Sequence, residues 1–155
     1  MSKTKIKSIN VFEQSIAEAH AGDSVSISLE DQIDISRGNM LVSPDELPTI
    51  SQDINLMVCW FNEKPLKTGG RYLIRLNTNE VGCIIRTVHY RMNINTLERD
   101  FENTVINMND IANISIKTSN PVFFDTYRKN NITGSLVLID EGTNETVAAG
   151  MIQEA

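Results

Sequence analysis

The sequence predicts an all-β protein made of antiparallel strands, with a small sheet preceding a complete barrel or sandwich. Two observations predict this class. Short apolar runs bounded by turn-forming residues recur along the 155 residues, and no long stretch has the period of an amphipathic helix. About seven such runs fall in the last hundred residues, a spacing typical of barrels and sandwiches. The hydrophobic content of 41% is enough for a buried core.

The first 51 residues predict a few antiparallel strands. Val25, Ile27 and Leu29 alternate with serines, which is the pattern of a half-buried strand. Gly22 is placed for a chain reversal, and the turn SRGN at 36–39 precedes a further short strand, MLV. Such a sheet has an exposed edge, and its opening strand starts almost at the initiator methionine. We therefore expect that upstream strands have been removed.

The segment PDELPTISQD at 44–53 predicts a connector, because its two prolines cannot donate to a strand ladder. We place a domain boundary near Ser51, with one unit over 1–51 and a second over 52–155. The strands expected in the second unit are INLMVCWF, RYLIRL, EVGCIIRTVHY, NISIKT, PVFF, SLVLID and TVAAGMI. The last two form a terminal hairpin around DEGTN.

Charge and composition argue against several classes of function. A net charge of −6 argues against binding to nucleic acid, which requires clustered Lys and Arg. No apolar run is long enough to span a membrane and no signal core follows the N-terminus, so we expect a cytoplasmic chain. Cys59 and Cys83 lie far apart within apolar runs and are expected in the core rather than in a disulfide or metal site.

A search for chemistry finds no catalytic, cofactor-binding or metal-binding pattern. The glycine pair of KTGG lacks the Lys-Ser/Thr of a phosphate loop and predicts a hairpin turn instead. The acidic segment LEDQID lacks the ligand spacing and central glycine of a cation loop. The remaining candidates have simple structural explanations, as surface or core residues: His20, His89, Trp60 and Phe61.

Three segments resemble one protein family. ISLEDQIDISRGNMLV (27–42) resembles the end of the second domain of translational-type GTPases. MVCWFNEKPLKTGGRYLIRLNTNEVGCIIRTVHYRMNINTLE (57–98) and the closing segment 109–152 are similar to the third domain in the large, GTP-hydrolysing subunit of bacterial sulfate adenylyltransferase. The closing landmarks are a Pro, Asp-x-Tyr, Thr-Gly-Ser, Ile-Asp, Thr-Asn-x-Thr-Val and Ala-Gly-Met-Ile.

The resemblance implies a Greek-key barrel like the third domain of elongation factor Tu, over 52–155, and the second half of a domain-two barrel over 1–51. It implies that GTP and Mg²⁺ bind to a nucleotide-binding domain that this chain lacks. The chain alone is then not an enzyme and has no cofactor. Its implied partners are that GTPase domain and the small catalytic subunit, which makes adenosine 5'-phosphosulfate and pyrophosphate from ATP and sulfate.

Within that resemblance, the residues expected at a docking surface or domain interface are Arg37, Asp125, Tyr127 and Arg128, since Arg and Tyr are enriched at interface hot spots. The alternative is that Asp125 and Arg128 only pin the DTYRKN turn. Two other functions stay open: an RNA-binding or protein-interaction module of a translation-factor-like GTPase, and an enzyme with a cryptic site. The unpaired strand edge in residues 4–29 predicts one of two outcomes: a homodimer through this segment, or packing of the segment across the second barrel.

Overall fold

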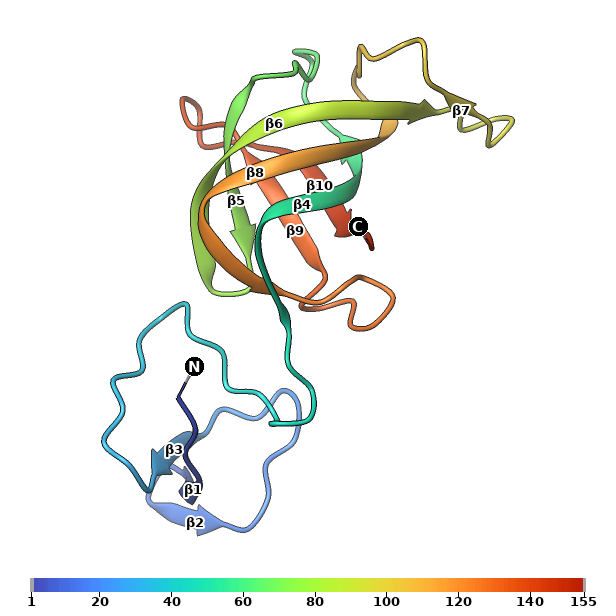
Figure 1. Ribbon diagram of the computed structural model, residues 1–155. Helices are drawn as coiled ribbons and strands as arrows, with labels where there is room; N and C mark the ends of the chain where they lie inside the picture. The colour runs from blue at the N-terminus through green and yellow to red at the C-terminus, as the bar shows by residue number, and fades with distance from the viewer. Residues whose placement is uncertain (1, 155) are drawn as a thin grey trace. The chain divides into compact units, whose positions relative to one another are not determined.

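The computed structural model describes residues 2–154 and contains ten β-strands in two sheets (Figure 1). None of these residues lies in a helix, which confirms the all-β class. Consequently, no helix in the described range has the length and hydropathy needed to cross a membrane. The chain divides into two compact units, Met1–Ser36 and Arg37–Ala155.

The first unit contains a three-stranded antiparallel sheet. Strand β1 (Ile6–Val11) lies between β2 (Gln14–Ile16) and β3 (Ser26–Leu29). The pairing confirms the strand expected from the Val25–Leu29 alternation. Gly22 has a φ of +99° in the reversal between β2 and β3, as its position in the sequence predicted.

The prediction of a short strand at Met40–Val42 is wrong. This segment has no ladder partner, and Leu41 and Val42 are exposed. Pro44 follows two residues later and cannot donate a backbone hydrogen bond. An apolar run without a pairing partner stays extended and irregular.

The second unit is a closed antiparallel barrel of six strands. The strands follow the order β5-β9-β10-β4-β8-β6, and pairing between β5 and β6 closes the cylinder. Their bounds are β4 (Thr49–Trp60), β5 (Arg71–Leu76), β6 (Asn79–Met92), β8 (Ile111–Phe124), β9 (Ser135–Ile139) and β10 (Thr146–Ile152). β5, β6 and β8 pair one after another, and β4, which precedes all three in the chain, lies beside β8; this arrangement is a Greek key, as the resemblance implied.

The runs NISIKT and PVFF, expected as two strands, form the single strand β8. Its register against β4 shifts opposite Gln52, which leaves Ser119 to Pro121 outside the regular ladder. The Gln52 amide donates to the carbonyls of Thr118 and Ser119, and the single Thr118 O–H lies within donating distance of the carbonyls of Asn120, at 2.8 Å, and Gln52, at 3.2 Å. This bulge accommodates a proline, which a regular central ladder excludes.

The barrel interior is filled by one face of each strand. Ile54, Leu56, Val58 and Trp60 alternate inward along β4. Trp60 is almost completely buried, its indole N–H donates to the Lys64 carbonyl at 2.8 Å, and its ring meets Tyr72 edge to face at 5.7 Å. The core position expected for Trp60 is therefore confirmed.

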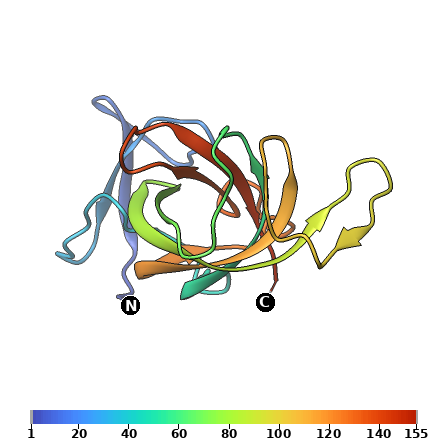
Figure 2. The same cartoon turned by 90° about the horizontal axis from the view of Figure 1, so that it is seen from above.

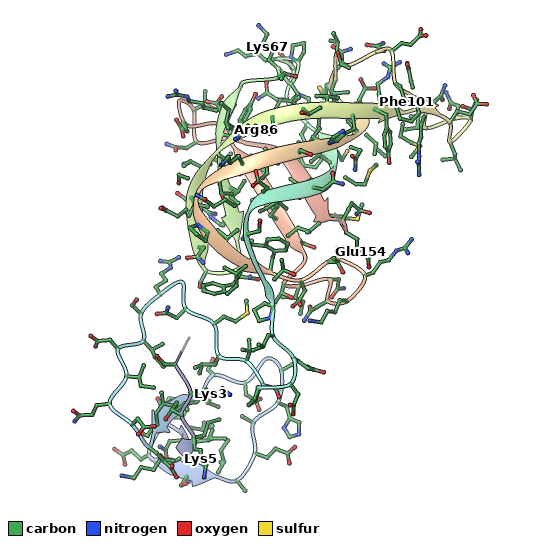
Figure 3. All side chains as sticks on the ribbon, viewed as in Figure 1. Lys3, Lys5, Lys67, Arg86, Phe101 and Glu154 are labelled. Atoms are coloured by element: carbon green, nitrogen blue, oxygen red, sulfur yellow. The ribbon has the colours of Figure 1, made fainter. Side chains whose placement is uncertain are left out.

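An arm extends from the barrel between the end of β6 at Met92 and the start of β8 at Ile111. In both views it projects away from the cylinder and carries β7 (Arg99–Asp100), which pairs with the end of β6 (Figures 1 and 2). Arg91 contacts the carboxylates of Asp100 and Asp110 at 3.4 and 3.6 Å. Phe101, labelled in Figure 3, lies on this arm against Tyr90.

The turn predicted at KTGG is present, but it does not join two paired strands. KTGG makes a tight turn, in which the Gly70 N–H donates to the Lys67 carbonyl. The strands on either side of it, β4 and β5, do not pair, so the prediction of a hairpin turn is wrong.

The predicted boundary near Ser51 falls within β4, whereas the compact units divide after Ser36. The assignment of 1–51 as half of a second-domain barrel stays a prediction.

Candidate docking site

A shallow groove of about 530 Å³ crosses the outer face of the barrel over β4, β10, β9 and β5. Outward side chains on these strands make its floor. Cys59 pairs with Ala149, Ala149 with Val137, and the adjacent row contains Met151. The full lining is Cys59, Arg75, Asn77, Tyr127, Ser135, Leu136, Val137, Ala149, Gly150 and Met151. We call this surface the outer groove.

The outer groove has an apolar floor on a side of the sheet that usually faces water. Met151 is 40% exposed in the described structure. In a barrel, residues alternate between interior and exterior, so outward positions are normally polar. An apolar floor with a polar margin is the composition of the core and rim of a protein interface.

The margin of the groove is polar and nearly neutral. Arg75 lies at the β5 side and forms an ion pair with Glu80, with 2.8 Å between Nη2 and Oε2. Asn77 lies in the two-residue turn between β5 and β6 with a φ of +54°. A margin of this kind has no strong net charge and so does not select for a strongly charged partner.

Tyr127 stands at the opposite margin because of the DTYRKN turn. Its backbone N–H donates to the carbonyl of Ile152, the last residue of β10, at 2.9 Å. The returning chain at Gly134 passes directly against the Tyr127 backbone, and Ile152 N–H donates to the Gly134 carbonyl at 2.8 Å. These backbone contacts fix the turn, and the Tyr127 side chain therefore lies at the edge of the groove. The residue is 37% exposed.

Asp125 is engaged within the same turn. Its carboxylate accepts hydrogen bonds from the Lys129 ammonium and the Thr133 hydroxyl, both at 2.7 Å. These bonds lower the pKa of Asp125, with the Lys129 contribution the largest. This geometry is what the turn-pinning alternative requires of Asp125.

The other two expected interface residues lie apart from the groove lining. Arg128 follows Tyr127 in the turn and is exposed, and Arg37 is exposed beside Gly38, whose carbonyl accepts from the Asn79 amide at 3.1 Å. Neither arginine forms an ion pair with any described residue. Of the four, the structure brings only Tyr127 to the groove, and an interface role for all four stays a prediction.

Sequence reasoning missed the apolar floor. The signal was present, because LMVCW in β4 and VAAGMI in β10 are apolar at successive positions instead of alternating. Beside the groove lining, the Met57 sulfur accepts from the Tyr90 hydroxyl at 3.6 Å and from the Asn113 amide at 3.5 Å. Reading these residues as outward-facing requires the strand register, which the sequence does not contain.

Other candidates for chemistry were located as well. A second, polar groove of about 560 Å³ lies at the barrel end beside Phe61 and Asp140. Asp140 caps the terminal hairpin by accepting hydrogen bonds from the backbone N–H groups of Thr143 and Gly142, and these bonds lower the pKa of Asp140. Among residues 2–154, no group of three or more His, Cys, Asp or Glu side chains is placed to hold a metal ion.

The two cysteines are free thiols in different surroundings. Cys83 is buried, and desolvation, assisted by the charge of Glu141, raises its pKa to about 12. Cys59 is only partly buried and lines the outer groove. The expectation of a core position is thus confirmed for Cys83, while Cys59 faces outward because it alternates with the inward Val58 and Trp60.

Comparisons with known proteins agree with this architecture. Residues 53–153 match the family described as GTP-eEF1A C-terminal domain-like. The structure of sup35 complexed with GDP superposes with a TM-score of 0.83 at 16% identity, covering 97% of this chain and 37% of that one. At that identity the likeness supports the fold alone.

Relatives with closer sequences share one description. Sulfate adenylyltransferase subunit 1 of Francisella tularensis is 40% identical over 149 residues, which are 96% of this chain and 32% of the relative. The same subunit of Bacteroides fragilis is 39% identical over 147 residues, covering 95% of this chain and 31% of the relative. The bifunctional enzyme CysN/CysC of Rhodopirellula baltica is 37% identical over 150 residues, covering 97% of this chain and 23% of the relative.

The chain thus spans about a third or less of the length of these relatives. The family match covers most of the chain, and the barrel matches that family in fold. The chain therefore belongs to the GTP-eEF1A C-terminal domain-like family and corresponds to the elongation-factor-like C-terminal domains of sulfate adenylyltransferase subunit 1.

Proposed function

We propose that this chain is a non-catalytic β-barrel region that docks onto the small catalytic subunit of a cytoplasmic sulfate adenylyltransferase and couples it to a GTPase domain. The observation that carries the proposal is the outer groove, with its outward apolar floor, its neutral polar margin and Tyr127 at its edge. The whole enzyme would convert ATP and sulfate to adenosine 5'-phosphosulfate and pyrophosphate. The chain would contribute contacts to this reaction, not chemistry.

A rigid barrel suits such a coupling role. Its six strands close on themselves, so a force applied at one face moves the whole body without opening a sheet edge. A GTPase domain changes shape when its switch segments lose the γ-phosphate, and transmission of that change needs a stable docked surface. GTP and Mg²⁺ belong to that domain in this proposal.

The first test measures binding of this chain to the small subunit from the same organism. Met151→Asp places a charge on the groove floor and should weaken binding at least about tenfold, because a buried unpaired charge is costly. Tyr127→Ala should weaken it by a smaller factor. Met108→Asp is the matched control, since Met108 is 50% exposed, outside the groove lining, and acquires the same charge.

A second readout uses Cys59 as a reporter within the groove. Bound small subunit should slow alkylation of Cys59 by a thiol reagent, because the bound surface covers the groove floor. Absence of binding by the wild-type chain would overturn the docking proposal. Equal losses for Met151→Asp and Met108→Asp would place docking on another surface.

The non-catalytic part of the proposal is tested separately. The purified chain should neither bind GTP at micromolar concentrations nor form a phosphosulfate from ATP and sulfate. Isothermal titration with GTP in the presence of Mg²⁺ measures the first property. A saturable heat signal with GTP would contradict this assignment whatever the docking experiment gives.

A further inference from the structure

The outer groove is one end of a longer apolar face on the outside of the sheet. Its floor residues Val137, Ala149 and Cys59 are cross-strand neighbours on β9, β10 and β4. The same row continues over β8, β6 and β7, and its full order is Val137, Ala149, Cys59, Ile111, Met92 and Arg99. Residues opposite one another on neighbouring strands lie on the same face of a sheet. The floor of the groove therefore continues to the arm.

A second row runs beside the first, two residues along each strand. Its order from β10 to β6 is Met151, Met57, Asn113 and Tyr90. The Met57 sulfur accepts from the Asn113 amide and the Tyr90 hydroxyl, and the Tyr90 ring contacts Phe101, with 5.4 Å between the ring centroids. Phe101, labelled on the arm in Figure 3, is 63% exposed. We call the two rows together with Phe101 the outer band.

The outer band carries no acidic or basic side chain between the groove and Arg99. The next rows toward the other end of the strands are polar and then charged, since Asn55 pairs with Ser115 and Asp53 with Lys117. The band crosses six strands, and five steps of about 4.8 Å give it a length of roughly 24 Å along the sheet. An apolar strip with polar borders is typical of a protein interface rather than of a solvated sheet face.

We propose that the small catalytic subunit covers the whole outer band, so that the arm forms the second end of its docking surface. This inference rests on the docking role proposed above. The outer groove has ten lining residues, whereas a stable interface usually takes about 20–30 residues from each side. The docking surface must therefore extend beyond the groove, and the outer band is continuous with the groove floor.

The arm is held in place before any partner binds. Arg91, at the end of β6, contacts the carboxylates of Asp100 and Asp110, which lie at the two ends of the returning segment. Within that segment Ile106 is fully buried and forms an isolated bridge with Leu66, whose N–H donates to the Ile106 carbonyl at 2.9 Å. A prepositioned arm loses little conformational freedom on docking, which favours binding.

The arm end of the outer band also indicates what the partner presents there. The Arg99 guanidinium lies 5.0 Å from the centroid of the Tyr90 ring and makes no ion pair within residues 2–154. Tyr and Arg are the residue types enriched at interface hot spots. The matching surface of the small subunit should therefore be apolar along the band and carry a carboxylate opposite Arg99.

The test places the photoreactive residue p-benzoylphenylalanine at one of three exposed aromatic positions and adds the small subunit. Tyr127 lies at the groove margin, Phe101 on the arm, and Phe61 at the barrel end outside the band. Tyr127 and Phe101 positions should each crosslink to the small subunit, and the Phe61 position, 44% exposed in the native chain, should not. Phe101→Ala should weaken binding about tenfold, whereas Phe61→Ala, the matched control, should change it less than about twofold.

The outcomes separate this inference from the proposed function. Crosslinking at Tyr127 without crosslinking at Phe101 would overturn the extended surface and leave docking at the groove intact. No crosslink at Tyr127 would overturn both, whatever happens at Phe101. Crosslinking of Phe101 to a second copy of this chain, equal crosslinking at Phe61, or equal binding by the two alanine variants would overturn the inference alone. Fluorescence of Trp60, the single tryptophan, reports whether the barrel of each variant is folded.

Discussion

Gly134 lies against the backbone of Tyr127 so closely that no side chain fits between them. A β-carbon on Gly134 would be 2.6 Å from both N and Cα of Tyr127 and 2.7 Å from the Asn130 carbonyl oxygen. All three neighbours are backbone atoms, which cannot rotate away. The Thr-Gly-Ser landmark is thus explained by packing, and it connects the terminal hairpin to the margin of the outer groove.

Gly134→Ala should destabilise the barrel by about 1–3 kcal/mol, the usual cost of inserting a methyl group into a packed site. Urea unfolding followed by Trp60 fluorescence measures this change. Gly82→Ala is the control, because a β-carbon there lies 3.8 Å or more from its neighbours and should change stability by less than about 1 kcal/mol. Equal effects of the two substitutions would show that the contact with Tyr127 does not constrain the turn.

Asp125 should make barrel stability depend on acid pH. Its pKa is lowered in the folded chain by the Lys129 and Thr133 hydrogen bonds. A carboxylate with a depressed folded pKa binds fewer protons when folded, so its contribution is complete above the unfolded pKa of about 4 and is lost as pH falls through the folded value.

Asp125→Asn should therefore reduce the free energy of unfolding by about 1–2 kcal/mol at pH 7. The difference from the wild-type chain should shrink as pH falls below about 4, because the unfolded wild-type chain then takes up a proton at Asp125 that the folded chain binds only at lower pH. Denaturant unfolding at pH 7 and pH 3 measures both values. Asp45→Asn, at an exposed position with the same change in charge, is the control. A difference that does not vary with pH would exclude the carboxylate as its source.

The bulge in β8 should depend on the Thr118 hydroxyl. Thr118 is buried, and its hydroxyl is placed to donate to the carbonyls of Gln52 and Asn120 at 3.2 and 2.8 Å. Thr118→Val keeps the shape but removes the one O–H donor that these two carbonyls share, at a cost of about 1–3 kcal/mol. Thermal unfolding compares it with Thr87→Val, an exposed threonine of β6. A neutral Thr118→Val would indicate that the Gln52 amide alone maintains the bulge.

This bulge also shows why the strand prediction was right in type and wrong in number. Pro121 cannot donate to a ladder, so the sequence favoured a break between NISIKT and PVFF. The Gln52 amide, 66 residues from Thr118 in sequence, donates to the carbonyls of Thr118 and Ser119 at the break in the ladder and lets one strand continue. Turn residues and alternation are local and could be predicted, whereas a bulge partner on another strand could not.

The outer groove, like the bulge, could be predicted only in part from the sequence. Tyr127 was expected at an interface from residue type alone, but its position at the groove depends on its contacts with Ile152 and Gly134. The floor depends on the register that puts Ala149 beside Cys59 and Val137. Cross-strand neighbours are determined by the closure of the barrel, so no single segment of the sequence contains them.

The two thiols should differ widely in reactivity toward a disulfide reagent at pH 8. The thiolate is the reactive form, and a pKa of about 12 leaves roughly one part in ten thousand of Cys83 ionised at that pH. Burial also blocks access of the reagent to Cys83, whereas Cys59 lies in the outer groove.

One equivalent of reagent should react with the native chain, at Cys59, and the second only after unfolding in urea. Cys59→Ser should abolish the native reaction, and Cys83→Ser should leave it unchanged. Rapid native labelling of Cys83 would mean that the barrel wall between β5 and β8 opens readily, and such a barrel would not be rigid enough for the coupling role proposed above.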